Sequence, residues 1–146
     1  MTALQRETDM HTHEMIAAHP HVRGSVNDVL SRCIDACHDC AQACTSCADA
    51  CLGEKSVAEL TQCIRLNLDC ADLCDVTAAV ATRRTGSNEG IIKRMLEVCA
   101  EACRICGEEC ARHASKHEHC RICADACKRC EGSCRDASET IKAAVH

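Results

Sequence analysis

Cysteine recurs with helical spacing between residues 33 and 51. It stands at positions 33, 37, 40, 44, 47 and 51, so the successive intervals are 4, 3, 4, 3 and 4 residues. Residues three and four apart share one face of an α-helix, and a sustained repeat of this kind marks the seam that a helix turns toward its partners. The spacing therefore predicts a helix with one inward stripe of thiols, roughly 27 Å long at about 1.5 Å per residue.

Three later stretches carry the same pattern. Cysteines at 99, 103, 106 and 110 are spaced 4, 3 and 4 residues apart, and those at 120, 123, 127, 130 and 134 are spaced 3, 4, 3 and 4 apart. A weaker copy has Cys63, Cys70 and Cys74, with Asn67 where a further cysteine would continue the stripe. Together the stretches predict four helices that turn their thiols toward a shared interior.

The composition indicates that these thiols form the core. The 146 residues include 18 cysteines but no Phe, Trp or Tyr. A chain of this length is expected to fold as one domain, and its Leu, Ile and Val are too few for an ordinary interior. Free cysteine behaves as a small hydrophobe, so a cysteine-filled interior is possible but thin, and a bound ligand would stabilise it.

Matched helices joined mainly by short connections favour an all-α fold, an antiparallel up-down four-helix bundle. We assign residues 25–146 to the bundle and residues 1–24 to an N-terminal arm, with a short helix over Thr8–Ala18 that Pro20 ends. Capping signals place the bundle helices over these spans: Ser25 to Gly53, Ser56 to about Arg84, about Ile91 to His113, and Lys116 to about Ala143.

Antiparallel threading makes the two ends of the bundle different. One end is expected to be apolar and to gather Val26, Leu30, Thr77, Met95 and Ile141. At the other end the stripe through Cys110 continues to His113 and His117, beside Cys51 and Cys120, so this end is the expected opening. Other histidines are expected to be at most weak surface sites: His11, His13, His19, His21, His119 and His146.

Charge and hydropathy exclude several function classes. The net charge of −5 is mild and mixed, and no aromatic side chains can stack on bases, so nucleic acid is not an expected partner. No apolar run approaches the length of a membrane span. Residues 1–22 carry several charges and no continuous apolar segment, so the expected location is the reducing cytoplasm. No catalytic constellation is evident, and the chain is not expected to be an enzyme.

An even ladder of thiols suits a soft cation, since thiolates select Cu(I), zinc and iron–sulfur clusters. Structural zinc requires four converging ligands and iron–sulfur clusters require cysteines bent around the cluster, whereas these thiols lie along straight helices. Cu(I) accepts about two or three thiolates, and one Cu(I) per thiolate leaves little charge to bury. We expect many Cu(I) ions, roughly eighteen if each thiolate bridges two.

Two alternative functions stay open on these residues. One is zinc buffering of the metallothionein kind, at about four thiolates per ion. The other is an iron–sulfur or dithiol redox protein, although no thioredoxin-like strand precedes any CxxC and the thiols are redundant. Relative stoichiometry for Cu(I) and zinc separates zinc buffering from the binding of many Cu(I) ions.

The repeats over Cys33–Cys51, Cys99–Cys110 and Cys120–Cys134 resemble the cytosolic branch of the bacterial copper storage proteins, a family of cysteine-lined four-helix bundles. The resemblance covers nearly the whole chain beyond residue 25. It implies a homotetramer, Cu(I) held by pairs of thiolates inside each bundle, and copper uptake at an open end where His113 and His117 match by position. The expected metal-binding residues are these two histidines with Cys33, Cys37, Cys40, Cys44, Cys47, Cys51, Cys63, Cys70, Cys74, Cys99, Cys103, Cys106, Cys110, Cys120, Cys123, Cys127, Cys130 and Cys134.

Overall fold

Helices alone make up the regular structure of residues 10–142, which are the residues that this computed structural model describes. Two short helical segments accompany four long ones. In chain order they are α2 (Thr12–Ala17), α3 (Asp28–Leu52), the 3-10 helix η1 (Val57–Leu60), α4 (Thr61–Thr82), α5 (Glu89–His113) and α6 (Glu118–Thr140).

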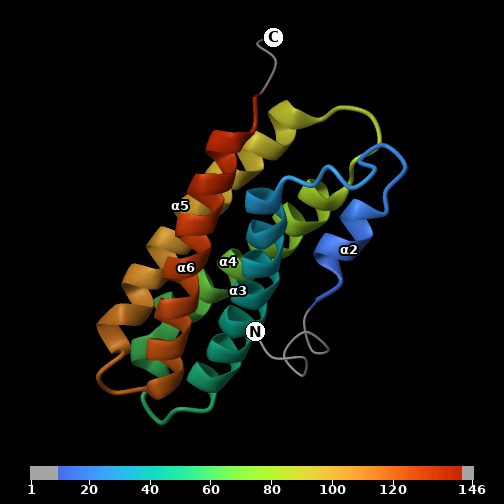
Figure 1. The fold of residues 1–146 in the computed structure, drawn as a ribbon. Coiled ribbons are helices and arrows are strands. Elements are labelled where there is room, and N and C mark those ends of the chain that lie inside the picture. Colours follow the sequence, from blue (N-terminus) through green and yellow to red (C-terminus); the bar gives the residue numbers. More distant parts are fainter. Residues whose placement is uncertain (1–9, 143–146) are drawn as a thin grey trace.

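The long helices alternate in direction around a common axis (Figure 1). Helix α3 packs on α4 and α6, and α5 packs on the same two neighbours, so each helix has two antiparallel partners. The α3–α4 and α5–α6 connections meet at one end of the bundle, while the α4–α5 connection lies at the other (Figure 1). The predicted all-α, up-down four-helix bundle is confirmed.

The helix boundaries differ from the predicted ones by a few residues. Helix α3 is capped by Asn27, whose side-chain oxygen accepts a hydrogen bond from the Leu30 N–H at 3.0 Å, so the prediction of Ser25 was wrong. Asparagine caps as well as serine and stands directly before the first helical residue. At its other end α3 stops before Gly53, as predicted.

The second and fourth bundle helices begin later than the predicted starts at Ser56 and Lys116, and neither has a side-chain N-cap. Ser56 precedes the 3-10 helix η1, and α4 itself begins only at Thr61 and ends at Thr82. Helix α5 begins at Glu89, two residues earlier than expected. Helix α6 begins at Glu118, because the backbone of His117 is extended. The last helix ends at Thr140, and the expected end at Ala143 lies outside the described residues.

The N-terminal arm packs on the outside of α3 (Figure 1). Its helix α2 buries Ile16, and the Thr12 hydroxyl donates a hydrogen bond to Asp35 at 2.6 Å. The predicted start of this helix at Thr8 lies outside the described residues. The arm residues that the structure describes therefore cover one flank of the bundle and reach the α4–α5 connection, where His19 Nε2 lies 3.0 Å from the Thr85 hydroxyl.

Cysteine and alanine side chains make up much of the bundle interior. All 18 cysteines are buried, with small buried alanines such as Ala41, Ala71 and Ala100 beside them. Between α5 and α6, a Cβ on Gly107 would lie 3.2 Å from the Cys127 Cβ, which is tighter than an ordinary contact, so this position favours glycine. Among the helices of residues 10–142, none combines the length and the hydropathy needed to cross a membrane.

One bundle end is closed by apolar side chains, as predicted, although its members differ. Leu30, Thr77 and Ile141 are buried there. Val26 and Met95 are only half-buried, and the fully buried side chains of α5 at this end are Ile92 and Leu96 instead. We call these five buried residues the apolar end: Leu30, Thr77, Ile92, Leu96 and Ile141.

Candidate metal centre

The cysteines of all four long helices meet in one interior, which we call the thiol column. Every one of its 18 thiols is free and buried. The shortest Sγ–Sγ distances are 3.6 Å, for example between Cys33 and Cys134, far longer than the roughly 2.05 Å of a disulfide. The structure thus brings together all the cysteines that the sequence predicted to face inward.

Neighbouring sulfurs in the column are close enough to share metal ions. Cys37 Sγ lies 3.8 Å from the sulfurs of Cys130 and Cys134 and 3.9 Å from that of Cys99. A soft ion bound to sulfur at about 2.3 Å, as zinc is, can join two sulfurs up to roughly 4.6 Å apart. Each of these pairs is therefore within reach of one ion.

The column also contains groups of cysteines whose four sulfurs all lie within 4.8 Å of one another. Four such groups are Cys37, Cys99, Cys130 and Cys134; Cys40, Cys74, Cys103 and Cys130; Cys40, Cys44, Cys70 and Cys127; and Cys44, Cys106, Cys123 and Cys127. Successive groups share members, Cys130, Cys40 and Cys44 among them. The groups are thus overlapping parts of one column rather than separate closed cages.

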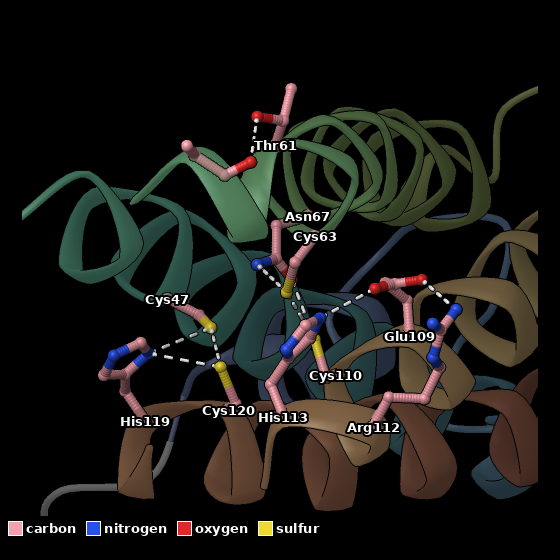
Figure 2. Close-up of polar contacts among 11 residues, drawn as sticks. Cys47, Thr61, Cys63, Asn67, Glu109, Cys110, Arg112, His113, His119 and Cys120 are labelled. Carbon is pink, nitrogen blue, oxygen red and sulfur yellow. Dashed lines mark hydrogen bonds and ion pairs between the residues drawn. The ribbon is translucent and has the colours of Figure 1, made fainter. Parts of the chain in front are cut away.

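Asn67 fills the gap in the α4 stripe and connects the thiols around it. Its side chain is fully buried, and its oxygen accepts hydrogen bonds from the thiols of Cys106 at 3.1 Å, Cys110 at 3.3 Å and Cys123 at 3.1 Å. Its amide nitrogen donates to Cys63 Sγ at 3.6 Å (Figure 2). The amide thus replaces a thiol in the stripe, and both its oxygen and its nitrogen are hydrogen-bonded.

Two thiols toward the histidine end are held in the protonated form. Burial, followed by repulsion from a charged Cys63 nearby, raises the pKa of Cys51 to about 11 and that of Cys120 to about 12. Desolvation disfavours a thiolate more than a neutral thiol. A metal ion that binds these sulfurs must therefore release their protons, and its binding strengthens as the pH rises.

The end opposite the apolar end carries the two predicted histidines, and we call it the open end after the role that the sequence predicts for it. His113 pairs with Glu109 through Nε2 at 2.8 Å, and its side chain is 18% exposed (Figure 2). His117 pairs through Nδ1 with Glu54 Oε2 at 2.9 Å and is 14% exposed. Both rings lie at the bundle end formed by the α3–α4 and α5–α6 connections, as the sequence predicted.

His119 is a member of the open end that the sequence reasoning missed. Its Nδ1 lies 3.4 Å from Cys47 Sγ and 3.6 Å from Cys120 Sγ (Figure 2). The prediction of a weak surface site was wrong, because the first turn of α6 directs this ring onto the end of α3. One signal was present in the sequence: His119 stands four residues before Cys123, on the same helix face.

The other histidines stay away from the thiols where the structure describes them. His13 pairs with Asp28 and His19 with Thr85, both on the arm side of the molecule. His11 lies beside Glu14 on the surface, and His146 falls outside the described residues. Histidine chemistry next to the thiol column is therefore concentrated at the open end.

Fold and interior together define a class of protein, an all-helical bundle whose core is a connected set of thiols for many soft metal ions. Comparison with known proteins then assigns the family. The family model of the copper storage protein, Csp, matches residues 26–139. The chain belongs to the copper storage protein family.

Individual relatives agree with this assignment. The copper storage protein Ccsp of Streptomyces lividans, in a structure loaded with 10 copper equivalents, is 49% identical, with 88% of this chain and 98% of that chain covered and a TM-score of 0.84. Cu(I)-bound BsCsp3 is 38% identical, with 75% and 98% covered and a TM-score of 0.66. The cysteine-rich protein YhjQ of Bacillus subtilis is 41% identical over 103 residues, 70% of this chain and 90% of YhjQ.

Proposed function

We propose that this protein stores or buffers copper in the cytoplasm, as many Cu(I) ions bound by the thiolates of the column. The observation that carries the proposal is the connected, buried array of 18 free cysteines with neighbouring sulfurs 3.6 to 4.0 Å apart. Thiolates prefer Cu(I), and one Cu(I) per thiolate leaves the interior nearly neutral. The copper-loaded relatives support the same cargo, and the cytosolic location given for the Streptomyces lividans protein supports the compartment.

The proposal assigns copper binding to the 18 cysteines and copper uptake to the open end. His113 and His117 support this assignment because both lie at that end, remain 18% and 14% exposed, and pair with Glu109 and Glu54. Imidazole is a suitable ligand for copper. Copper would then pass inward by exchange between neighbouring sulfurs, so the role is binding and transfer rather than catalysis.

An anaerobic titration tests the storage function directly. Fully reduced metal-free protein is titrated with Cu(I) against a chromophoric competitor, and a parallel titration uses Zn²⁺. We expect tight uptake of more than about ten Cu(I) per chain and of only a few Zn²⁺ ions. Saturation at about four or fewer Cu(I) would contradict storage and indicate discrete sites.

His113→Ala is expected to slow Cu(I) loading more than it lowers capacity. The variant removes an imidazole at the open end but leaves every thiol of the column in place. Stopped-flow loading from a Cu(I) donor measures the rate, and equilibrium titration measures the capacity. His13→Ala, which removes an imidazole from the arm, is the control. Equal loading rates in both variants would remove His113 from the uptake path.

We also propose that the chain assembles as a homotetramer. Helix α5 carries a stripe of exposed apolar side chains at seven-residue intervals: Ile91 at 57%, Val98 at 49% and Ile105 at 38% exposure. Such a stripe is the pattern of a helix that packs on another helix. Sedimentation equilibrium of the reduced protein measures the mass, and a monomeric mass at all concentrations would contradict the assembly.

A further inference from the structure

Thr77 places a hydroxyl without a hydrogen-bond partner at the apolar end of the bundle. Its side chain is 1% exposed, and within residues 10–142 its Oγ1 is the only buried side-chain nitrogen or oxygen that makes no hydrogen bond. An unpaired buried polar group destabilises the folded state, and nearly all such groups in proteins are paired. Valine has nearly the same shape and lacks the hydroxyl, so the threonine requires a role that valine would not fill.

The position of Thr77 in α4 relates it to the thiol column. The inward residues of this helix follow one another at intervals of 4, 3, 4, 3 and 4 positions, and all are at most 1% exposed: Cys63, Asn67, Cys70, Cys74, Thr77 and Ala81. Residues three apart share a helix face, so Thr77 stands on the face of Cys74, about one turn further along. The hydroxyl therefore lies where the column of thiols gives way to the apolar end.

The outermost thiol of α3 lies at the level of Thr77 along the bundle axis. The sulfurs of Cys74 and Cys37 lie 3.6 Å and 3.9 Å from that of Cys99, so these three residues mark one level of the bundle. Helix α3 packs on α4 and runs antiparallel to it (Figure 1). One turn beyond Cys74 on α4 therefore corresponds to one turn before Cys37 on α3, and that position is Cys33.

Copper loading would change the surroundings of this hydroxyl. A metal-free thiol is a weak hydrogen-bond acceptor, whereas a Cu(I) ion displaces the thiol proton and leaves a thiolate. Cys33 and Cys134, whose sulfurs lie 3.6 Å apart, stand at the end of the column beside buried Leu30 and Ile141. Thiolates there have copper ions on one side only, so their charge is compensated less than in the middle of the column. A hydroxyl that donates to such a sulfur stabilises its charged form.

We propose that the Thr77 hydroxyl donates a hydrogen bond to the Cys33 thiolate when the column is filled, and so strengthens copper binding at the apolar end. Thr77 is then a residue that acts through a copper ligand and does not bind copper itself. The unpaired hydroxyl destabilises the metal-free protein and finds its partner in the loaded one. This inference rests on the proposed storage of Cu(I) by the column.

Thr77→Val removes the hydroxyl with little change in shape. In the reduced metal-free protein the midpoint of guanidinium unfolding should stay the same or rise, because an unpaired buried group is lost. In the loaded protein the roughly two Cu(I) ions that Cys33 can serve should be held about 10-fold less tightly, the equivalent of one hydrogen bond to a charged group. Competition with a chromophoric Cu(I) chelator measures this fraction. Thr77→Ser should retain the parent affinity, and Thr45→Val, on the exposed face of α3, should change neither quantity.

Cys33→Ser identifies the acceptor of the hydrogen bond. Because interacting residues have non-additive effects, Thr77→Val should weaken Cu(I) binding in the parent protein and cause no further loss in the Cys33→Ser background. Unchanged Cu(I) affinity in Thr77→Val, or the same loss in both backgrounds, would overturn the inference. Saturation of the parent protein at a few Cu(I) ions would instead contradict storage itself, so the two failures are distinguishable.

Discussion

Replacing Cys40, Cys44, Cys103 and Cys127 by serine should lower the Cu(I) capacity by at least about four ions per chain. These cysteines lie in the overlapping groups at the middle of the thiol column, and Cys40 and Cys44 each belong to two of those groups. Serine keeps nearly the same shape but presents a hard, protonated oxygen that Cu(I) does not favour. Since each Cu(I) takes two thiolates and each thiolate can serve two ions, the loss should at least match the number of thiols removed.

The control for this variant places four hydroxyls in the core without removing a thiol. Ala41, Ala71, Ala100 and Ala126 are buried beside the column, and their replacement by serine tests the cost of buried polar groups alone. Both variants are titrated with Cu(I) after their helix content has been compared by circular dichroism. Unchanged capacity in the cysteine variant, or an equal fall in both variants, would contradict storage by the column.

Leu96→Ala should destabilise the metal-free protein by about 3 kcal/mol. Leu96 is fully buried at the apolar end of a chain that has no aromatic side chains, so its truncation removes a large part of the aliphatic packing there. Domains of this size are stable by only about 5 to 15 kcal/mol, so the variant should be close to unfolding under mild denaturant. The folded bundle holds its thiols in neighbouring pairs, so Cu(I) should bind it more tightly than the unfolded chain, and loading should restore part of the loss.

Guanidinium unfolding of the reduced protein, with and without Cu(I), measures this effect. Glu97→Ala is the matched control, because Glu97 is the next residue of α5 and faces solvent. A change below about 1 kcal/mol in Leu96→Ala would show that the apolar end contributes little. Loss of stability that copper does not restore would show that the apolar end and the thiol column do not act as one folding unit.

Much of the fold follows from spacing within single helices. The 4,3 repeat of cysteines determines that Cys33 to Cys51 share one face, and the structure buries all of them. The helix ends were predicted less accurately than the helix faces. Asn27 rather than Ser25 caps α3, and η1 occupies the turn where α4 was expected to start. Several neighbouring side chains can satisfy the same free N–H groups, so local sequence alone does not select one.

Asn67 shows what the cysteine spacing predicts about a buried residue and what it leaves open. Its position in the stripe indicated an inward side chain, and the structure buries it completely. The thiols that donate hydrogen bonds to it, those of Cys106, Cys110 and Cys123, lie on α5 and α6. These bonds therefore depend on how α4, α5 and α6 are shifted relative to one another along the bundle axis. Helix packing and the connections between helices set these shifts, and the spacing of cysteines within one helix does not describe them.

The sequence by itself determined the cysteine faces, the four-helix class and the preference for a soft cation, because all three depend on residue identity and on distances of three or four positions along one helix. Only the tertiary structure decided which donors meet at the open end. His119 reaches Glu54, 65 positions away, and Cys47, 72 positions away, through the way the α3–α4 connection and the first turn of α6 pack together. Such contacts depend on the offset between helices, and that offset is fixed by the packing of the whole bundle.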